Sequence, residues 1–564
     1  MLATDILTLS AFIVVILITL PFLGSYMAKV FEGEKNILSP VVGGLENKFY
    51  RLCGINHDRE MNYKEYLFAL LMFNFLGAVL LFLILALQNH LPFNPQHLNG
   101  VPFWLNFNTT ISFITNTNWQ SYSGENTLSY FSQLAGLCVQ NFLSAATGIA
   151  VIVAFAKGLR RKQTSEIGNF WVDLTRSLLY ILLPLSVIMA ILLMSQGVVQ
   201  TFSNYVTAIT LEGAKQLIPL GPAASQIAIK QLGSNGGGFF GVNSLHPFEN
   251  PTPFSNFLEV VAILLIPAAL TYTFGKLVGA RRHGLVLFAA MATIFAVNLG
   301  ISLWAEHHTN PSLYNLPFLE GKDTRFGITN SVLWTITTTS VSNGSVNAMI
   351  SSMSPITGMI ATINLILGEA IFGGVGAGLY MMLMFVILTV FIAGLMVGRT
   401  PEYLGKKIEA WEVKLAVIAV LLPASAILIG TMIACLSSLG LSSLTNHGPH
   451  GLMEMLYAFA SASQNNGSAF AGLNANTNFY NFSLGICMLI GRYAVIIPAL
   501  LIAGSLGGKK YTPPSAGTFA TDNTVFVLLL IGVIIIIGGL TFFPALSLGA
   551  IAEHLLMINK SFLF

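Results

Sequence analysis

Residues 232–238 read Leu-Gly-Ser-Asn-Gly-Gly-Gly, a run of small and polar residues in an otherwise apolar chain. Three further segments repeat this pattern: a semi-apolar part of short-helix length turns abruptly into Ser, Thr, Asn and Gly. The four segments are residues 102–123, 215–245, 326–349 and 450–474, with polar centres Thr115-Asn116-Thr117-Asn118, Ser234-Asn235-Gly236-Gly237, Ser342-Asn343-Gly344-Ser345 and Asn465-Asn466-Gly467-Ser468. One such run is typical of a surface turn, but four of them indicate a repeated structural unit.

The polar centres recur at a nearly constant interval. Aligned on a shared asparagine, they make Asn116, Asn235, Asn343 and Asn466 equivalent, at spacings of 119, 108 and 123 residues. In this alignment Thr117 stands where the other three repeats have glycine. Basic loops recur at almost the same interval, with first cations Lys157, Lys276, Arg399 and Lys509. The chain is therefore expected to contain four copies of one unit: span, polar hairpin, span and basic loop.

Apolar residues dominate the rest of the chain. Of its 564 residues, 54% are hydrophobic and 9% are charged, whereas soluble domains carry about 25% charged residues. This composition predicts an integral membrane protein. The formal net charge is +3 and no segment forms a basic domain, which argues against a nucleic-acid partner.

Ten runs are long enough to cross a membrane as helices. We place them near residues 6–28, 66–88, 128–156, 170–198, 256–280, 285–305, 357–397, 413–437, 479–505 and 524–546. The seventh run is too long for one straight helix and contains Gly368, Gly373, Gly374, Gly376 and Gly378. Because glycine destabilises helices, a broken or re-entrant element is expected there.

Lysine and arginine mark alternate connecting loops. Twenty of the 26 cations lie in five loops, as Lys29, Lys35, Lys48, Arg51, Arg59 and Lys64; Lys157, Arg160, Arg161, Lys162 and Arg176; Lys276, Arg281 and Arg282; Arg399, Lys406, Lys407 and Lys414; and Lys509 and Lys510. The positive-inside rule makes these loops cytoplasmic. Both termini are then expected to be extracytoplasmic, and the four polar hairpins are expected to face outward.

The expected fold class is an all-α polytopic membrane protein. Four fused channel-like repeats, each a span, a short pore helix and a second span, form a pseudo-fourfold arrangement with one extra helix at each end. We expect this order: a first span and inward loop in residues 1–64, repeat 1 in 65–165, repeat 2 in 166–283, repeat 3 with the glycine-broken helix in 284–411, repeat 4 in 412–512, and a final span in 513–564.

Four hairpins of this composition have the plan of a cation selectivity filter. A dehydrated alkali cation needs several oxygen ligands, and rings of backbone carbonyls supply them. Glycine permits the unusual dihedral angles that such a backbone requires, and asparagine tolerates the left-handed region better than most residues. The polar centres contain no Asp or Glu. We therefore expect a monovalent cation held by neutral dipoles rather than a divalent cation held by an acidic ring.

Several longer strings resemble one known family. They are Thr-Asn-Thr-Asn-Trp-Gln (115–120), Asn-Gly-Gly-Gly-Phe-Phe (235–240), His-Pro-Phe-Glu-Asn-Pro-Thr (246–252), Gly-Arg-Thr-Pro-Glu-Tyr-Leu-Gly-Lys-Lys-Ile (398–408) and Asn-Asn-Gly-Ser-Ala-Phe (465–470). They closely resemble the A subunits of the bacterial Kdp potassium transporters, and the resemblance runs along the whole chain.

The resemblance implies a partner set and a site. A chain of this family binds extracytoplasmic K+ in the bacterial inner membrane, in a complex with a P-type ATPase B subunit, a C subunit and a small F peptide. K+ is then expected to leave the filter sideways, into the B subunit. Carried over by motif, the filter residues are Asn116, Thr117, Asn118, Asn235, Gly236, Asn343, Gly344, Asn466 and Gly467, with Gln120 at the filter mouth.

Two charges lie inside apolar runs, Glu369 and Arg492. Intramembrane charges are costly and so indicate function by default. A cation at Arg492, below the filter, would repel K+ from a straight path and favour lateral exit; the alternative is a structural ion pair with Glu369. The residues from Glu369 through Gly373 and Gly374 resemble the gating loop of the family, and Phe385 is a candidate for the lateral exit.

The chain has no phosphate-binding loop, no Asp-Lys-Thr-Gly phosphorylation motif and no inward loop large enough for a nucleotide domain. We therefore expect no ATP hydrolysis and no bound nucleotide. Three functions remain open: the K+-binding subunit of an ATP-driven importer, a stand-alone K+ channel or ion-coupled transporter, and an inverted-repeat transporter of organic solutes. The third requires repeats of opposite orientation, whereas the cations predict four repeats of one orientation.

Overall fold

The computed structural model describes residues 3–308, 318–398, 400–513 and 518–559. Arg399, one of the predicted loop cations, lies outside the described residues. Within these ranges ten helical segments are long and apolar enough to span a membrane, which confirms the expected number. The spans are Ala3–Glu32, Tyr63–Ala86, Ser132–Arg160, Phe170–Ser195, Pro253–Leu277, Arg281–His307, Ala377–Met396, Ala410–Leu436, Asn478–Gly508 and Thr524–Ile558.

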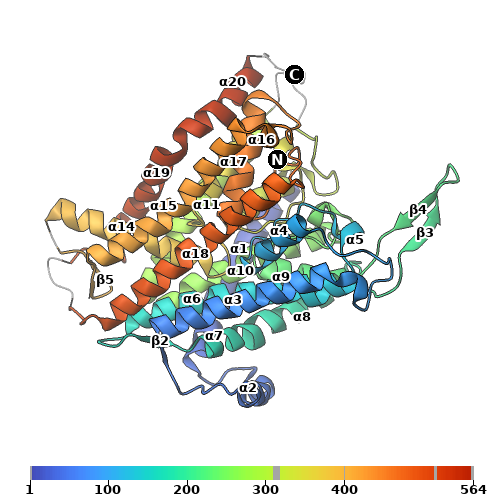
Figure 1. The fold of residues 1–564 in the computed structure, drawn as a ribbon. Helices are drawn as coiled ribbons and strands as arrows, with labels where there is room; N and C mark the ends of the chain where they lie inside the picture. The colour runs from blue at the N-terminus through green and yellow to red at the C-terminus, as the bar shows by residue number, and fades with distance from the viewer. Residues whose placement is uncertain (1–2, 309–317, 399, 514–517, 560–564) are drawn as a thin grey trace.

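Four units of span, short helix and span follow one another between two outer helices (Figure 1). The outer helices are α1 (Ala3–Glu32) and α19 (Thr524–Leu546). The units are α3 (Tyr63–Ala86), α4 (Phe103–Ile114) and α6 (Val139–Arg160); α7 (Phe170–Arg176) with α8 (Leu183–Ser195), α9 (Ala223–Leu232) and α10 (Pro253–Leu277); α11 (Arg281–His307), α12 (Gly327–Ser340) and α13 (Pro355–Ile366) with α14 (Ala377–Val397); and α15 (Ala410–Leu436), α17 (Gly448–Ser463) and α18 (Asn478–Gly508). The all-α fold of four channel-like repeats is therefore confirmed.

Local sequence signals set where several helices begin. The Asn62 side chain caps α3 by accepting hydrogen bonds from the backbone N–H groups of Lys64 and Glu65. In return, the Glu65 carboxylate accepts a hydrogen bond from the Asn62 backbone N–H. Thr252 and Glu409 form the same type of capping box before α10 and α15. Such caps satisfy backbone donors that a helix leaves free at its first turn.

The seventh span is broken, as its glycines predict. Helix α13 ends at Ile366, α14 begins at Ala377, and an irregular loop joins them. Glu369 and Phe372 in this loop have φ of 59° and 65°. Positive φ is rare for residues other than glycine and stores strain. The loop is held inside the bundle, because a Cβ at Gly376 would collide with the backbone of Gly148 in α6.

Several elements outside the spans were not predicted, among them a β-hairpin and a helix that lie outside the bundle. The strands β3 (Val206–Ile209) and β4 (Lys215–Ile218) form a hairpin that extends away from the bundle (Figure 1). Helix α2 (Ser39–Cys53) lies beside the bundle and is seen end-on in Figure 1.

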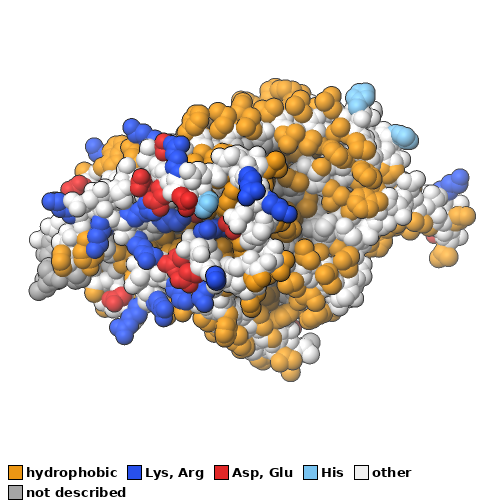
Figure 2. Space-filling view, turned by 90° about the horizontal axis from the view of Figure 1, so that it is seen from below, with side chains coloured by type: hydrophobic (Ala, Val, Ile, Leu, Met, Phe, Trp, Pro, Cys, Tyr) orange, Lys and Arg blue, Asp and Glu red, His pale blue; other side chains and the backbone are white. Residues whose placement is uncertain are grey.

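Figure 2 shows broad hydrophobic surface over the spans and a concentration of Lys, Arg, Asp and Glu at one end. An apolar belt with charged residues beyond it is the surface expected of a protein surrounded by lipid.

Candidate functional site

All four short helices are followed by the same backbone conformation and the same hydrogen bond. Two residues after each helix ends, the chain enters the left-handed region, at Asn116, Ser234, Ser342 and Asn465, with φ of 67°, 50°, 50° and 49°. The next residue donates its backbone N–H to the carbonyl five residues earlier. These bonds are Thr117 to Ser112 (2.9 Å), Asn235 to Lys230 (2.9 Å), Asn343 to Thr338 (2.9 Å) and Asn466 to Ser461 (2.8 Å).

This pattern corrects the register predicted for the first repeat. The residue equivalent to Asn235, Asn343 and Asn466 is Thr117, not Asn116. Asn118, whose φ is 54°, therefore stands where the other repeats have glycine. The sequence alignment matched asparagines to one another. The backbone instead uses Asn116 for the left-handed turn, a conformation that asparagine and serine both adopt here.

The four filter loops, residues 115–120, 233–238, 341–346 and 464–469, contact one another in a closed ring. Loops one and two are joined by the Asn235 side-chain amide, which donates to Asn116 Oδ1 at 2.5 Å. Loops two and three are joined by the Gly344 N–H, which donates to the Asn235 carbonyl at 3.3 Å. Loop four reaches loop three through Asn466 Nδ2, which donates to the Asn343 carbonyl at 3.2 Å.

The ring closes between the last and the first loop. Asn465 Nδ2 donates to Thr117 Oγ1 at 2.9 Å. Thr117 Oγ1 lies 2.7 Å from the hydroxyl of Thr115, which in turn donates to the Ile111 carbonyl in α4. All four short helices end at this ring, as the plan of four channel-like repeats predicts. The partly negative C-terminal ends of the short helices face the ring.

Three glycines allow the loops to approach so closely. A Cβ at Gly344 would lie 2.7 Å from the Asn466 carbonyl oxygen. A Cβ at Gly236 would collide with the backbone of Gly344, and one at Gly467 would collide with the Thr117 carbonyl. Gly236 and Gly467 also have φ of 98° and 99°. Both the close approach and the backbone conformation therefore require glycine.

Two other predicted residues lie in or beside the ring, Asn118, which is buried, and Gln120, which is half-buried. Asn118 donates from Nδ2 to Asn141 Oδ1 at 2.7 Å. Gln120 bridges the first two loops, because its Oε1 accepts the Gly238 N–H at 2.7 Å and its Nε2 donates to the Gly238 carbonyl at 3.1 Å. The Asn343 carbonyl accepts hydrogen bonds from Thr338 and Asn466, so an ion-binding role for this carbonyl stays a prediction.

Supporting residues on α6 were missed in the sequence. Ser144 Oγ donates to Asn116 Oδ1 at 2.7 Å, and the Asn141 carbonyl accepts from Asn235 Nδ2 at 3.2 Å. Both residues are fully or nearly fully buried. The available signal was their spacing, since two polar residues three positions apart in an apolar span share one helix face.

The broken span lies beneath the ring. The Gly373 N–H donates to the Ser340 carbonyl at the end of α12 at 3.0 Å. The Glu369 carboxylate interacts with the side chain of Ser342 and the backbone N–H of Gly374. A Cβ at Gly374 would lie 3.8 Å from Glu369 Oε2 and 3.9 Å from Asn116 Nδ2, so this loop adjoins the first filter loop as well.

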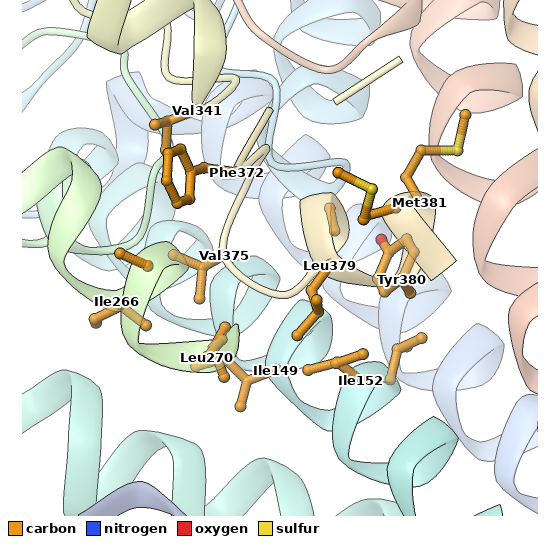
Figure 3. Close-up of a cluster of buried hydrophobic side chains, with 14 of the residues drawn as sticks. Ile149, Ile152, Ile266, Leu270, Val341, Phe372, Val375, Leu379, Tyr380 and Met381 are labelled. Atoms are coloured by element: carbon orange, nitrogen blue, oxygen red, sulfur yellow. The ribbon is translucent and has the colours of Figure 1, made fainter. Parts of the chain in front are cut away.

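An apolar floor continues below this loop. Figure 3 shows Phe372 beside Val341, and Val375 and Leu379 between helices α6 and α10. These side chains are all at most 3% exposed. A dehydrated cation has no oxygen ligands in such a cluster, so the floor opposes a straight path through the bundle.

Arg492 is buried in α18, close to the loop of the broken span. Its Nη2 donates to the Ser144 carbonyl at 3.1 Å. The ion pairs formed by the described residues do not include one between Arg492 and Glu369. The two charges interact across a small cavity that both side chains line. The direct ion pair considered from the sequence is therefore absent among the described residues.

Two small cavities lie beside the fourth filter loop. The first is lined by Asn465, Glu369 and Arg492, and the second by Phe385 together with residues of α15 and α19. Gly368, Met381 and Gln464 line both cavities. Phe385 thus lines a cavity that shares these three residues with the cavity beside the fourth filter loop.

Residues 10–555 match the family model described as the potassium-transporting ATPase A subunit. A Pseudomonas aeruginosa protein named potassium-transporting ATPase potassium-binding subunit is 57% identical, over 98% of this chain and 99% of that protein. Proteins of the same name from Rhodospirillum centenum and Leptospira interrogans are 56% and 53% identical, over 95% and 99% of this chain and 94% and 99% of their own length.

A solved structure shares the fold. The potassium transporter TrkH from Vibrio parahaemolyticus superimposes with a TM-score of 0.50, at 14% sequence identity, over 89% of this chain and 98% of that chain. At this identity the likeness concerns the fold alone.

Proposed function

Because the chain belongs to the family of potassium-transporting ATPase A subunits, we propose that it is the potassium-binding, channel-like subunit of an ATP-driven K+ importer. The relatives at 53% to 57% identity carry the name potassium-binding subunit. The observation that carries the proposal is the closed ring of four neutral loops. Such a ring offers backbone and amide oxygens to a monovalent cation, and its polar centres have no carboxylate to favour a divalent ion.

K+ would bind at the predicted filter residues and enter from outside. The filter comprises Asn116, Thr117, Asn118, Asn235, Gly236, Asn343, Gly344, Asn466 and Gly467, with Gln120 at its mouth. The cation-rich loops support an inner-membrane protein whose ring faces outward and whose termini are extracytoplasmic. The six segments expected from the sequence, with repeats in residues 65–165, 166–283, 284–411 and 412–512, remain our description of its organisation.

The ion would leave sideways rather than straight through. The apolar floor and the broken-span loop oppose a vertical path, and the buried cation of Arg492 repels K+ from it. The two adjoining cavities support a lateral route past Glu369 and Gly368 towards Phe385. Gly373 and Gly374 would then act as part of a gate below the filter.

Energy for uptake would come from partner subunits. This chain has no nucleotide motif, so a P-type ATPase B subunit would receive K+ at the lateral exit and hydrolyse ATP. A C subunit and a small F peptide complete the proposed complex. K+ is the transported ion.

Purification of the tagged chain from its own host tests this function. We expect a P-type ATPase to co-purify and the complex to hydrolyse ATP faster in K+ than in Na+ at equal ionic strength. The competing function, a stand-alone K+ channel, predicts K+ flux in liposomes containing this chain alone. If that flux matches the flux of the complex and no ATPase co-purifies, the proposed function is wrong.

A further inference from the structure

The second short helix differs from the other three at one position behind the filter. The residue whose carbonyl receives the loop N–H carries a hydroxyl in three repeats: Ser112, Thr338 and Ser461. Each hydroxyl bonds its own filter loop, to the Trp119 carbonyl (3.0 Å), the Ser345 carbonyl (2.8 Å) and the Gly467 N–H (3.0 Å). In the second repeat this residue is Lys230. A cation therefore replaces a neutral group directly behind a cation site.

Lys230 is fully buried and paired. Its Nζ donates to Asn243 Oδ1 at 2.8 Å and forms an ion pair with Glu249, and both side chains of the pair are 0% exposed. Glu249 also supports the loop itself. Its Oε1 accepts the Phe240 N–H at 2.8 Å, and a Cβ on Gly238 would lie 3.0 Å from the same oxygen. The ion pair thus stands against the back of the second filter loop.

The same cluster continues to the third loop. Gln231, the neighbour of Lys230, donates from Nε2 to Glu259 Oε2 at 2.8 Å. Its Oε1 accepts from Ser345 Oγ at 3.0 Å and from Asn343 Nδ2 at 3.3 Å. Adjacent residues of α9 therefore hold two of the four loops.

We infer that Glu249 is a positioning residue that determines K+ affinity by neutralising Lys230 behind the filter. This inference rests on the proposed K+-binding function and names the charge pair that tunes it. With the pair intact, Lys230 anchors the second loop without repelling the bound cation. When Glu249 loses its charge, the lysine field reaches the ion through a low-dielectric interior, where charges interact strongly.

Charge-removal variants test the inference. The probe is K+ itself, added at constant ionic strength to the purified full chain with its co-purifying partners, and the readout is K+-dependent thermal stabilisation. We expect Glu249→Gln to weaken apparent K+ affinity about tenfold or more. Lys230→Met alone should not weaken it. The double variant Lys230→Met/Glu249→Gln should return to within about threefold of the wild type, because the uncompensated charge is gone.

The rescue separates electrostatics from packing. If the ion pair only holds the fold, the double variant loses both partners and binds K+ no better than Glu249→Gln, which would overturn the inference. Wild-type affinity in Glu249→Gln would overturn it as well. If Glu249→Gln does not fold, the double variant still decides: it must fold and bind K+ within the threefold limit.

A second buried ion pair supplies the matched control. Lys322 and Glu306 lie 3.0 Å apart with side chains 1% and 0% exposed. Glu306 accepts the backbone N–H of Ser354 at 2.7 Å, which lies before α13 rather than in a filter loop. Glu306→Gln should lower thermal stability and leave K+ affinity unchanged.

Normal K+ binding without any associated ATPase would refute the proposed function while leaving this inference intact.

Discussion

The side-chain amide of Asn465 donates to the hydroxyl of Thr117 at 2.9 Å, across 348 residues of sequence. This bond joins the fourth filter loop to the first and completes the ring. Thr117 occupies the position that asparagine holds in the other three repeats. The threonine accepts a hydrogen bond from Asn465, whereas the three asparagines donate their side-chain amides to groups of the preceding repeat.

Removal of the Thr117 hydroxyl should therefore open the ring. Thr117→Val keeps the shape but leaves the buried Asn465 amide without this acceptor, at a cost of about 1–3 kcal/mol. We expect apparent K+ affinity to fall about 5- to 100-fold, measured as K+-dependent thermal stabilisation. Thr117→Ser keeps the acceptor and should stay within about threefold of the wild type. Equal losses in both variants would contradict a role for this bond.

A methyl group should not be tolerated at Gly236. Gly236→Ala places a Cβ against the Gly344 backbone and imposes strain at a φ of 98°. K+ affinity and discrimination against Na+ should both decrease, by about tenfold or more, in a competition assay. The larger change Gly236→Asp also adds a charge to the ring and should alter selectivity further.

Gly300 provides the control for this substitution. It lies in α11, and a Cβ built there meets no heavy atom within 4 Å. Gly300→Ala should leave K+ binding unchanged. If Gly236→Ala and Gly300→Ala behave alike, the K+ site lies elsewhere in the chain.

Arg492 should control passage below the filter. Arg492→Gln removes the buried cation and its field while keeping a donor for the Ser144 carbonyl. We expect K+ uptake by the reconstituted complex to fall about tenfold or more, and Arg492→Lys, which keeps the charge, to retain most of it. Unchanged K+ affinity and turnover in Arg492→Gln would eliminate the proposed role.

Helix α2 should detach from the bundle in acid. Burial by itself raises the pKa of Glu46, but hydrogen bonds from Tyr180 (2.6 Å) and Tyr50 (2.8 Å) and the Arg176 guanidinium outweigh it and lower that pKa. The carboxylate therefore stabilises docking above pH 4.5, its ordinary pKa, and this contribution disappears as the pH falls through the lowered folded-state pKa.

A spin label on Cys53 reports this detachment. Cys53 is exposed at the last residue of α2, whereas Cys138 and Cys487 are buried. Label mobility should rise below pH 4.5, and Glu46→Gln should raise it already at neutral pH. Lys48→Gln changes an exposed residue of the same helix and should have no effect. A label that stays immobile in Glu46→Gln would show that other contacts hold α2.

Much of the fold followed from local features of the chain. Hydropathy predicted ten spans, and the glycines around Gly373 predicted the break between α13 and α14. The polar runs located four hairpins. Each of these properties depends on residues close together in sequence, so spacing and composition were sufficient to identify them.

The details of the filter were less accessible. The alignment placed Asn116 one residue out of register, because backbone φ rather than residue type defines equivalent positions in the loops. Asn141 and Ser144 were overlooked because an isolated polar residue in a span gives no indication of what it contacts. Lys230 and Glu249 lie 19 residues apart, and only the fold of the loop between them turns two costly charges into a neutral buried pair.

Sequence alone thus established the membrane location, the number of spans and the fourfold repetition. All three follow from the composition of the chain and from the spacing of its apolar, polar and basic segments, which do not depend on how the chain packs. The tertiary structure decided which loops touch, which carbonyls and amides are already engaged, and where Arg492 and Glu369 stand relative to the ring. Those features are contacts between segments hundreds of residues apart. Such a contact contributes to stability only after folding has brought its two partners together, so neither segment shows it by itself.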